Sequence, residues 1–528
     1  MGMPLAGFAI AQHQSMQGSH VVGYQNVMVL QDLPEMKPVK APVGETDVLL
    51  IRHGDSVHAY QATCPHAGAP LEQGAICDGK LICPWHKAAF NLDDGSLAEP
   101  LALSHLPQYP LRIENGMVQV KPEPLPARQP QSGSPSSAVF VIVGSGAAGS
   151  AAAWTLRDQG FAGKLILVDR EREAPYDRTA LSKFVAAGEM KISEVPAPVD
   201  DAFLQQVERY YGDVERLDSR QQNLHFADGS TLHFDKLLIA SGGVPQRPEI
   251  PGKALFGVHL LRSIEQADSL LREVDEKQKL VIIGNSFIGM ELASALRARG
   301  IEVQVIARDA LPFKKQFGSK VAGFFRQLHE GQGVRFIEGE VAALQGERQV
   351  CGVELKSGEV VPADVVLLAT GVAPATGFIH DIELLDDGSL PTNQQLQLSE
   401  NIWAVGDIAS YPVAKGYQRI EHYRVAQQQG RLAAKNMLGA TQVFDRVPFF
   451  WTAHFGTRYE YLGHASEWDQ FELIGSLDDQ KFIGFYGQQG KLAAVISCGM
   501  YTLTAELVMR MQQPMTLQQA ISLAKQRQ

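Results

Sequence analysis

Two hydrophobic patterns divide the chain. In roughly the first 120 residues, short apolar runs are separated by turn residues, first at His53-Gly54-Asp55 and again at Asp78-Gly79. Paired apolar runs around such turns predict β-hairpins. We therefore expect a small β-domain in this part of the chain.

Beyond residue 138 the pattern changes to strand, glycine-rich turn and helix. The segment AVFVIVGSGAAGSAAAWTLRDQG (138–160) leads from a β-branched strand into a helix of small residues. The segment LVIIGNSFIGMELASALRARG (280–300) repeats this plan, and each copy is followed by another strand. Two such copies predict two nucleotide-binding domains in tandem, each with a parallel sheet.

Two further segments complete this division. Residues 121–138 contain five prolines among Ser, Gly and Gln, a composition that is typical of a linker. The tail from Val447 is richer in Phe, Tyr and Trp, and predicts strands followed by a helix over residues 502–511.

Length, charge and cysteine usage narrow the class of protein. The 528 residues correspond to three or four domains of about 150 residues each. A net charge of −11 argues against nucleic acid as a partner. Five cysteines are an odd number that does not fit a secreted disulfide framework, and no run of about 20 apolar residues predicts a membrane span. The N-terminus lacks the basic residues of a signal peptide, so we expect a cytoplasmic protein.

The sharpest feature is a pair of short motifs that each contain one cysteine and one histidine. Cys64-Pro-His66 is followed by Cys83-Pro-Trp-His86, and each lies at a turn between predicted strands. Two cysteines and two histidines fit a structural zinc ion. They also fit a two-iron, two-sulfur cluster in which two thiolates hold one iron and two imidazoles hold the other.

The first glycine-rich turn has the full context of a dinucleotide-binding fingerprint. Gly144, Gly146 and Gly149 follow a strand and open a helix, and Asp169 ends the next strand. This places a pyrophosphate at a helix N-terminus and a carboxylate near ribose hydroxyls. Glu171 is the alternative carboxylate.

The second turn departs from the fingerprint. Gly284 and Gly289 are present, but Ser286 replaces the middle glycine. We expect its small side chain to weaken dinucleotide binding without abolishing it. Ala307 stands where an acid would favour NADH, and Arg308 follows it, so NADPH is open as well as NADH.

The segments CPHAGAPLEQG (64–74) and CPWHKAAFNLDDGSL (83–97) resemble a Rieske domain of the soluble ferredoxin type. This resemblance implies that Cys64, His66, Cys83 and His86 hold a [2Fe-2S] cluster. Lys87 departs from the glycine that is usual after the second histidine, and we expect this to change the solvent cover over the cluster.

The region after the linker resembles flavoprotein reductases with two dinucleotide sites. The resemblance rests on PYDR (175–178), LSK (181–183), LLIASGG (237–243), LLATGVAP (367–374) and IWAVGD (402–407). It implies FAD in the first domain and NAD(P)H in the second. It carries cofactor contacts over to Arg178, Lys183, Val214, Arg262, Gly371, Asp407, Tyr423 and Trp451. Glu291 would face the nicotinamide and pair with Lys183, and these two are the catalytic candidates.

As a whole, the chain resembles the Rieske-containing, apoptosis-inducing-factor-like FAD oxidoreductases. The fold class expected is a small all-β Rieske domain, an α/β reductase with two dinucleotide domains, and an α+β interface domain. The expected boundaries are 20–121 (Rieske), 122–137 (linker), 138–256 and 376–445 (FAD), 257–375 (NAD(P)H) and 446–528 (interface).

The function that this resemblance implies is electron transfer from NAD(P)H through FAD to the cluster. No Cys-x-x-x-x-Cys pair follows the FAD motif, which excludes the disulfide-reductase branch. The electrons would leave to an acceptor protein, with a ferredoxin, a cytochrome and an oxygenase as candidates. The alternative is a redox-sensing protein whose assembly NAD(P)H controls, and we also consider a homodimer.

Overall fold

The computed structural model describes residues 23–274 and 279–527. Residues 1–22, which carry the interpretation of the N-terminus as lacking a signal peptide, lie outside the described residues, as do the first residues of the expected 20–121 domain.

The N-terminal β-domain (residues 25–120) consists of three small antiparallel sheets. The His53-Gly54-Asp55 turn joins two of its strands, and Asp78-Gly79 joins two others, so both predicted hairpins are present. The sheets are β1(Gln25–Val29)-β10(Met117–Val120)-β9(Leu111–Glu114), β2(Val39–Val43)-β3(Thr46–His53)-β4(Ser56–Gln61), and β5(Ala75–Cys77)-β6(Lys80–Ile82)-β7(Ala89–Asn91)-β8(Leu97–Glu99).

The first dinucleotide domain contains a six-stranded sheet, largely parallel. Its glycine turn connects β11 to α1(Ala147–Asp158), and the chain then returns in β12 beside β11, as the βαβ pattern predicts. Strand β30 reaches this sheet from beyond the second domain. The strand order is β13(Glu208–Tyr211), β12(Lys164–Asp169), β11(Val139–Val143), β17(Lys236–Ile239), β30(Ile402–Ala404) and β29(Gln397–Ser399).

The second dinucleotide domain repeats this plan with a five-stranded parallel sheet. Its order is β19(Val258–His259), β26(Val365–Leu368), β20(Lys279–Ile283), β21(Glu302–Ala307) and β22(Arg335–Glu338). The helices α3(Ile264–Glu273), α4(Phe287–Ala298) and α5(Lys314–Gly331) belong to this domain. Each dinucleotide domain also carries a three-stranded antiparallel sheet, β14(Val214–Asp218)-β15(Asn223–Phe226)-β16(Thr231–His233) or β23(Val341–Gln345)-β24(Gly352–Leu355)-β25(Val360–Pro362).

The C-terminal domain (residues 447–527) is an antiparallel sheet followed by two helices. The sheet order is β33(Phe449–His454), β34(Thr457–Gly463), β37(Lys491–Cys498), β36(Lys481–Gln488) and β35(Gln470–Ser476). The helix α7(Tyr501–Arg510) matches the helix predicted over residues 502–511, and α8(Leu517–Arg527) follows it.

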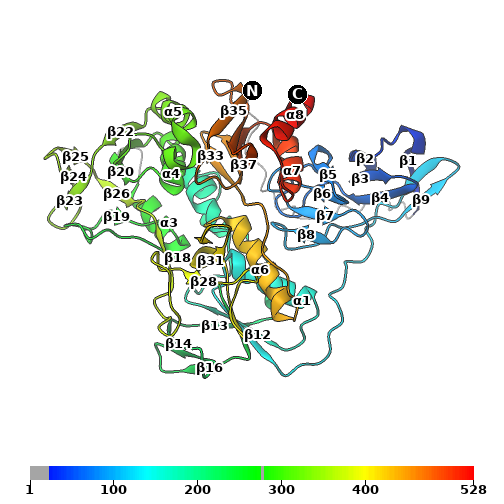
Figure 1. Ribbon diagram of the computed structural model, residues 1–528, viewed down its shortest axis with the longest axis horizontal. Helices are drawn as coiled ribbons and strands as arrows, with labels where there is room; N and C mark the ends of the chain where they lie inside the picture. The colour runs from blue at the N-terminus through cyan, green and yellow to red at the C-terminus, as the bar shows by residue number, and fades with distance from the viewer. Residues whose placement is uncertain (1–22, 275–278, 528) are drawn as a thin grey trace.

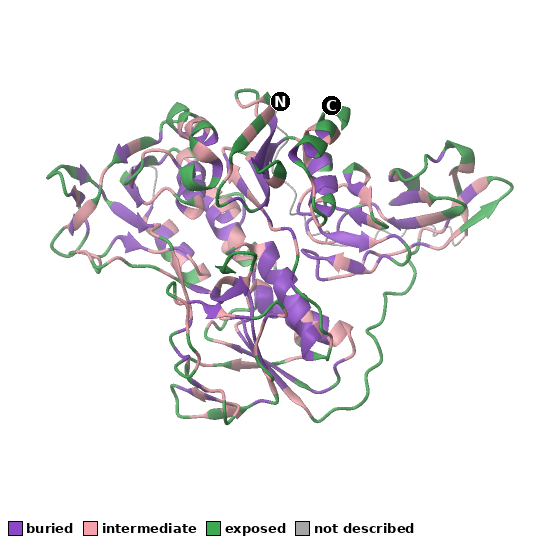
Figure 2. Cartoon of the chain, in the orientation of Figure 1, coloured by how far each residue is buried: buried purple, intermediate pink, exposed green. Residues whose placement is uncertain are grey.

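The N-terminal β-domain packs against the rest of the chain. Figure 1 places strands β5 to β8 beside α7 and near α6(Tyr423–Met437). Ala75, Ile82 and Ala89 share one apolar cluster with α7, α8 and β33. Helix α6 is buried along most of its length, as Figure 2 shows, because it lies between α1 and this β-domain. None of the helices in the described part has the length and apolar character needed to cross a bilayer.

Candidate active site

The two segments that carry the expected cluster ligands, residues 64–69 and 83–88, are called the first and second cluster loops. They have the same backbone conformation. Cys64 donates its N–H to the carbonyl of Ala69 at 2.8 Å, and Cys83 donates to Ala88 at 2.8 Å. The fifth residue of each loop has a positive φ, 73° at Gly68 and 61° at Lys87. Both loops therefore turn through a left-handed residue at the same place.

The two loops differ in their surroundings. In the first loop, Gly68 is exposed, as is Thr63 directly before it. In the second loop every residue from Cys83 to Ala88 is buried, apart from the half-buried Trp85. One loop is therefore covered by protein while the other keeps an exposed side.

The four expected ligands form two pairs. The Nδ1 atoms of His66 and His86 lie 3.0 Å apart, and the buried thiols of Cys64 and Cys83 lie close enough to shift each other's pKa. Among the described residues, no three His, Cys, Asp or Glu side chains converge on a position that could hold one metal ion. A thiol pair beside an imidazole pair fits a two-iron cluster with one pair on each iron, and it does not fit a single tetrahedral zinc ion.

The protonation states of three of these groups suit metal binding, whereas the hydrogen bond with Cys83 and burial raise the pKa of the Cys64 thiol well above its usual value. Burial opposes ionisation of Cys83, but the hydrogen bond from Cys64 and the backbone N–H groups of His86 and Trp85 lower its pKa to about 7. Burial lowers the pKa of His66 and of His86 below the usual range, which keeps both imidazoles neutral. Neutral imidazole and thiolate are the forms that bind iron.

Lys87, which we expected to change the solvent cover over the cluster, lies away from solvent. Its side chain is fully buried, and its Nζ lies 3.0 Å from a carboxylate oxygen of Glu460 on β34. Burial lowers the pKa of Lys87 to about 8, and Glu460 counteracts this effect. The C-terminal domain covers this loop through Lys87, a contact that the local sequence could not reveal.

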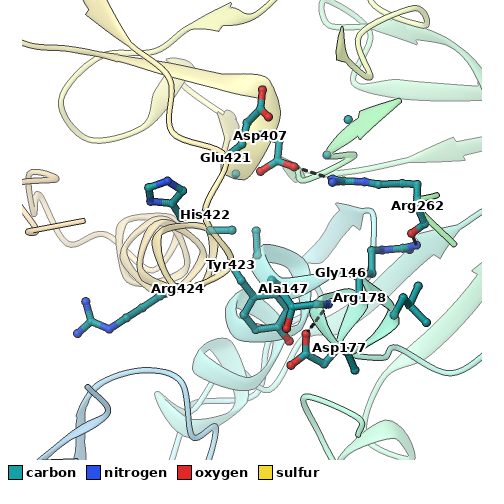
Figure 3. A pocket seen from close by; sticks show the side chains of 18 of the residues that line it. Gly146, Ala147, Asp177, Arg178, Arg262, Asp407, Glu421, His422, Tyr423 and Arg424 are labelled. Carbon is teal, nitrogen blue, oxygen red and sulfur yellow. Dashed lines mark hydrogen bonds and ion pairs between the residues drawn. The ribbon is translucent and has the colours of Figure 1, made fainter. Parts of the chain in front are cut away.

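Most of the expected FAD contacts surround one cavity of about 320 Å³. Figure 3 shows part of its wall, with Tyr423 at the start of α6 opposite Gly146 and Ala147 at the start of α1. The sequence-predicted residues that line it are Gly144, Gly146, Asp169, Glu171, Arg178, Lys183, Arg262, Glu291, Asp407, Tyr423 and Trp451. Sequence reasoning missed Asp177, Glu421, Phe287 and Phe450, which also line it.

The glycine turn of the first domain forms a cradle for a pyrophosphate. Gly144 has φ 98°, and a Cβ there would lie 2.3 Å from the carbonyl oxygen of Ala240. A Cβ on Gly149 would lie 1.9 Å from the carbonyl oxygen of Gly144, so this glycine allows helix and strand to pack closely. Gly146 begins the N-terminus of α1 with open space beside it. This is the arrangement that binds a dinucleotide phosphate.

Charged side chains around the cavity are fixed by one another. Arg262 contacts Asp407 at 2.6 Å, an ion pair that is drawn in Figure 3. Arg178 contacts Glu171 at 2.8 Å. Asp169 accepts a hydrogen bond from the backbone N–H of Ser145 at 3.0 Å. The residues present therefore fit an FAD group with its pyrophosphate and hydroxyls.

Lys183 and Glu291 meet at the wall of the cavity. Lys183 Nζ lies 3.0 Å from Glu291, and it also lies 4.9 Å from the ring centre of Trp451. Glu291 accepts hydrogen bonds from the hydroxyls of Ser182 at 2.6 Å and Thr452 at 2.7 Å. The family lysine and glutamate are thus brought together from positions 108 residues apart in the chain.

The fingerprint positions Gly284, Ser286 and Gly289 of the second turn lie outside this cavity, but the turn has the same backbone conformation as the first. Gly284 has φ 110°, and a Cβ there would lie 2.3 Å from the carbonyl oxygen of Ala369. Ser286 has φ −79°, close to the −66° of Gly146, so this position does not require glycine. The predicted contacts that do not line the cavity are Gly149, Val214, Gly284, Ser286, Gly289, Arg308 and Gly371.

The cluster loops open onto the same cavity as the FAD contacts. His66 and His86 are both part of its lining. The ring of His86 lies 5.4 Å from the ring of Trp451, measured between centres. The cavity is therefore lined both by the glycine turn of the first domain and by two of the predicted cluster ligands. Two redox groups bound at these two sets of residues would lie close together.

Comparison with known proteins agrees with this geometry. The family model for pyridine nucleotide-disulphide oxidoreductase matches residues 139–430, and that for the Rieske [2Fe-2S] domain matches residues 23–110. Apoptosis-inducing factor 3 of Homo sapiens is 33% identical over 488 residues, which cover 89% of this chain and 80% of that protein.

Two reductases match a smaller share of the chain. The ferredoxin–NAD(+) reductase component of the biphenyl dioxygenase system of Paraburkholderia xenovorans (strain LB400) is 34% identical over 337 residues, 62% of this chain and 81% of that protein. The solved covalent putidaredoxin reductase–putidaredoxin complex superposes with a TM-score of 0.69 at 25% identity, covering 74% of this chain and 99% of that chain.

Proposed function

Because the chain belongs to the pyridine nucleotide-disulphide oxidoreductase family and carries a Rieske [2Fe-2S] domain, we propose that it passes electrons from NAD(P)H through FAD to the cluster and on to an acceptor protein. The N-terminal β-domain is called the Rieske domain from here on. The observation that carries this proposal is the single cavity that His86, Trp451 and Lys183 line together.

The chemistry belongs to the bound groups and the protein positions them. When bound, FAD takes a hydride from NAD(P)H and the cluster takes electrons singly, so each NAD(P)H yields NAD(P)⁺, one proton and two reduced acceptors. We assign the pyrophosphate to the N-terminus of α1 and the pairs Arg262–Asp407 and Arg178–Glu171 to the orientation of FAD.

We propose that Lys183 and Glu291 lie at the side of the cavity where the nicotinamide binds. Glu291 lies on α4, the helix that follows the glycine turn of the second dinucleotide domain, and it points into the cavity beside Phe287 and Ile288. Its carboxylate holds the Lys183 ammonium in place, and the buried surroundings exclude water from the reacting face. This pair therefore fixes the position of a positive charge where a hydride is transferred.

The acceptor is a small electron-transfer protein in this proposal. Several relatives are named as ferredoxin–NAD(+) reductases, and the putidaredoxin reductase is joined to putidaredoxin in its solved complex. We propose a ferredoxin-type acceptor, ahead of a cytochrome or an oxygenase. Cys77, Cys351 and Cys498, which are not predicted cluster ligands, are free thiols, and this supports a reducing compartment such as the cytoplasm. A homodimer remains part of the proposal to be tested.

The test begins with the optical spectrum of the purified protein, followed by anaerobic addition of NADH and, separately, NADPH. We expect a flavin band and a broad visible cluster absorption, both bleached by at least one nucleotide. Steady-state turnover with a ferredoxin or cytochrome c would follow. Failure of both nucleotides to bleach the flavin would refute the proposal. Slow turnover with every acceptor, together with a change of oligomer size on nucleotide binding, would favour the redox-sensing alternative.

A further inference from the structure

The contact between the Rieske domain and the reductase contains a buried ion pair. Lys87 of the second cluster loop and Glu460 of β34 have fully buried side chains, and they are 373 residues apart in the chain. The Lys87 Nζ donates to both carboxylate oxygens, at 3.0 and 3.1 Å, and to the carbonyl oxygens of Pro84 at 2.6 Å and Tyr501 at 3.3 Å. The ammonium therefore joins its own loop to two elements of the C-terminal domain.

The carboxylate of Glu460 has its own partners in the C-terminal domain. Arg458 lies 3.2 Å from one oxygen, and the hydroxyl of Thr504 on α7 donates to the other at 2.5 Å. Two charges can be buried stably only where pairing and further hydrogen bonds satisfy them. Arg458 and Thr504 therefore fix the Glu460 carboxylate on the C-terminal domain, where it can pair with a cation from the Rieske domain.

The backbone of Lys87 adds to this observation. Its φ of 61° lies in the left-handed region, and the equivalent residue of the first loop is Gly68, with φ 73°. A residue with a side chain is uncommon in this conformation, whereas glycine adopts it freely. The turn alone favours glycine at this position. The lysine is therefore explained by the contact that its side chain makes, not by the turn.

A second contact holds the same loop from α6. Arg424 donates from Nη2 to the carbonyl oxygen of Lys87 at 3.1 Å and from Nε to that of Pro100 at 3.2 Å. One turn further along α6, Gln428 donates to Glu99 of β8 at 2.7 Å. Figure 3 shows Arg424 leaving α6 on the side away from Asp407. Both the side chain and the carbonyl of Lys87 are thus bound by the reductase.

We propose that Lys87 is a positioning residue that locks the cluster loop onto Glu460, so that the Rieske domain receives electrons while docked on its own flavoprotein. Lys87 directly follows His86, whose ring lies beside Trp451 in the FAD cavity. Fixing Lys87 therefore fixes the distance between the cluster ligands and that cavity. In this electron-transfer step the Rieske domain stays docked on the reductase and does not move between positions on its linker. The inference rests on the proposed function.

The decisive variant is Lys87→Gly. It removes the ion pair but leaves a residue that prefers the observed backbone conformation, so the cluster loop keeps its shape. We expect an unchanged cluster spectrum and unchanged bleaching of the flavin by NAD(P)H. After rapid mixing with NAD(P)H, we expect reduction of the cluster to slow at least tenfold. Hydrogen exchange of β6 and β34 should become faster, because the interface opens.

Two further variants complete the experiment. Lys40→Ala, which removes an exposed ion pair with Asp47 on β2 and β3 of the same domain, should behave as the unmodified protein. Glu460→Gln removes the partner charge without touching the cluster loop, so it answers the same question if Lys87→Gly loses its cluster. It should also slow the reduction of the cluster.

The outcomes separate this inference from the proposed function. If Lys87→Gly and Glu460→Gln reduce the cluster at the rate of the unmodified protein, with unchanged hydrogen exchange at β6 and β34, the lock is refuted and the proposed function stands. If the unmodified protein fails to reduce its cluster with either nucleotide, the proposed function itself is refuted. Slower cluster reduction in both variants, with flavin bleaching intact, supports the lock.

Discussion

Glu291 shows how a charged residue is kept in a buried place. Its side chain is only 4% exposed, yet its carboxylate faces the Lys183 ammonium and accepts hydrogen bonds from Ser182 and Thr452. A buried charge with this many partners is stable only while the partners remain. Removing the charge leaves the ammonium of Lys183 buried without its counter-ion.

We predict that Glu291→Gln destabilises the protein and impairs its reduction. The free energy of unfolding should fall by about 3 kcal/mol, as is typical when one member of a buried ion pair is removed. Flavin bleaching by NAD(P)H should slow as well, because Lys183 loses its fixed position. Denaturant titration and rapid mixing measure the two effects. Equal stability of the variant and the unmodified protein would contradict the assignment.

Arg308 is also a predicted site residue with an ion pair, but unlike Glu291 it lies at the surface. Its side chain is 81% exposed and pairs with Glu340 at 3.2 Å, at the end of β21. We predict that Arg308→Ala raises the KM for NADPH roughly tenfold, because one charge-assisted contact to the 2′-phosphate is lost. The KM for NADH and the stability should not change. Steady-state kinetics with both nucleotides tests this, and an equal KM for NADPH before and after substitution would exclude the role.

At the scale of elements, a buried hydrogen-bonded chain connects α5 to the cavity. The Thr452 hydroxyl that donates to Glu291 also contacts His454 Nε2 at 3.0 Å, and His454 Nδ1 contacts His329 Nε2 at 3.2 Å. Because a carboxylate can only accept, Thr452 must accept from His454 in turn. The second dinucleotide domain and β33 are therefore joined through two neutral histidines.

Acid should weaken this contact between α5 and β33. Burial lowers the pKa of His329 to about 3, and burial together with His329 lowers that of His454 well below the usual value. The unfolded chain takes up protons near pH 6.5 while the folded chain does not, so stability is full above pH 6.5 and is lost as pH falls toward 3. Each histidine should contribute about 1.4 kcal/mol per pH unit in this window.

The measurement is the free energy of unfolding between pH 7 and pH 4, compared with His329→Gln. We expect the variant to lose less stability per pH unit, because one proton fewer is taken up on unfolding. The matched control is His53→Gln, in an exposed turn of the Rieske domain, which should keep the slope of the unmodified protein. An identical slope in the His329 variant would disprove the buried-histidine account.

Local elements could be predicted from the sequence, and contacts between domains could not. The hairpin at Asp78-Gly79 and the strand-turn-helix units depend on residues that are neighbours in the chain. By contrast, Arg424, Gln428 and Arg431 lie on one face of α6 and bind Rieske residues more than 320 positions away. Polar side chains on a helix usually indicate a solvated face, whereas this face is buried.

The same limit applies to the site residues. The departure from glycine at Lys87 is visible in the sequence, but its partner Glu460 is not, because the two residues meet only after the C-terminal domain has folded. Ser286 shows the opposite case. It departs from the fingerprint, yet its ordinary backbone angles explain why a side chain is tolerated there.

At the scale of the whole molecule, the interface and the linker have different roles. The linker is exposed over residues 123–137, whereas the Rieske domain shares an apolar cluster with the C-terminal domain and two buried charged contacts with it and α6. Large apolar interfaces between domains hold them in one arrangement. The covalent connection is therefore not what keeps the Rieske domain in place.

We predict that cutting the linker leaves the protein assembled. A protease recognition site inserted near residue 127 should be cleaved readily, and the two fragments should still elute together in size-exclusion chromatography. Cluster reduction by NAD(P)H should keep its rate. The same cleavage in the Lys87→Gly variant should release the Rieske domain. Separation of the fragments in the unmodified protein would show that the linker, not the interface, holds the two parts together.

The unequal cover of the two cluster loops has one more consequence. The loop around His86 is enclosed by the reductase, while Thr63 and Gly68 keep the other loop open to solvent. In the proposed function, an acceptor can therefore reach the Rieske domain at the first loop while the second loop stays covered. An acceptor that approaches at Thr63 does not compete with the flavoprotein for the covered loop, so both can be engaged at once.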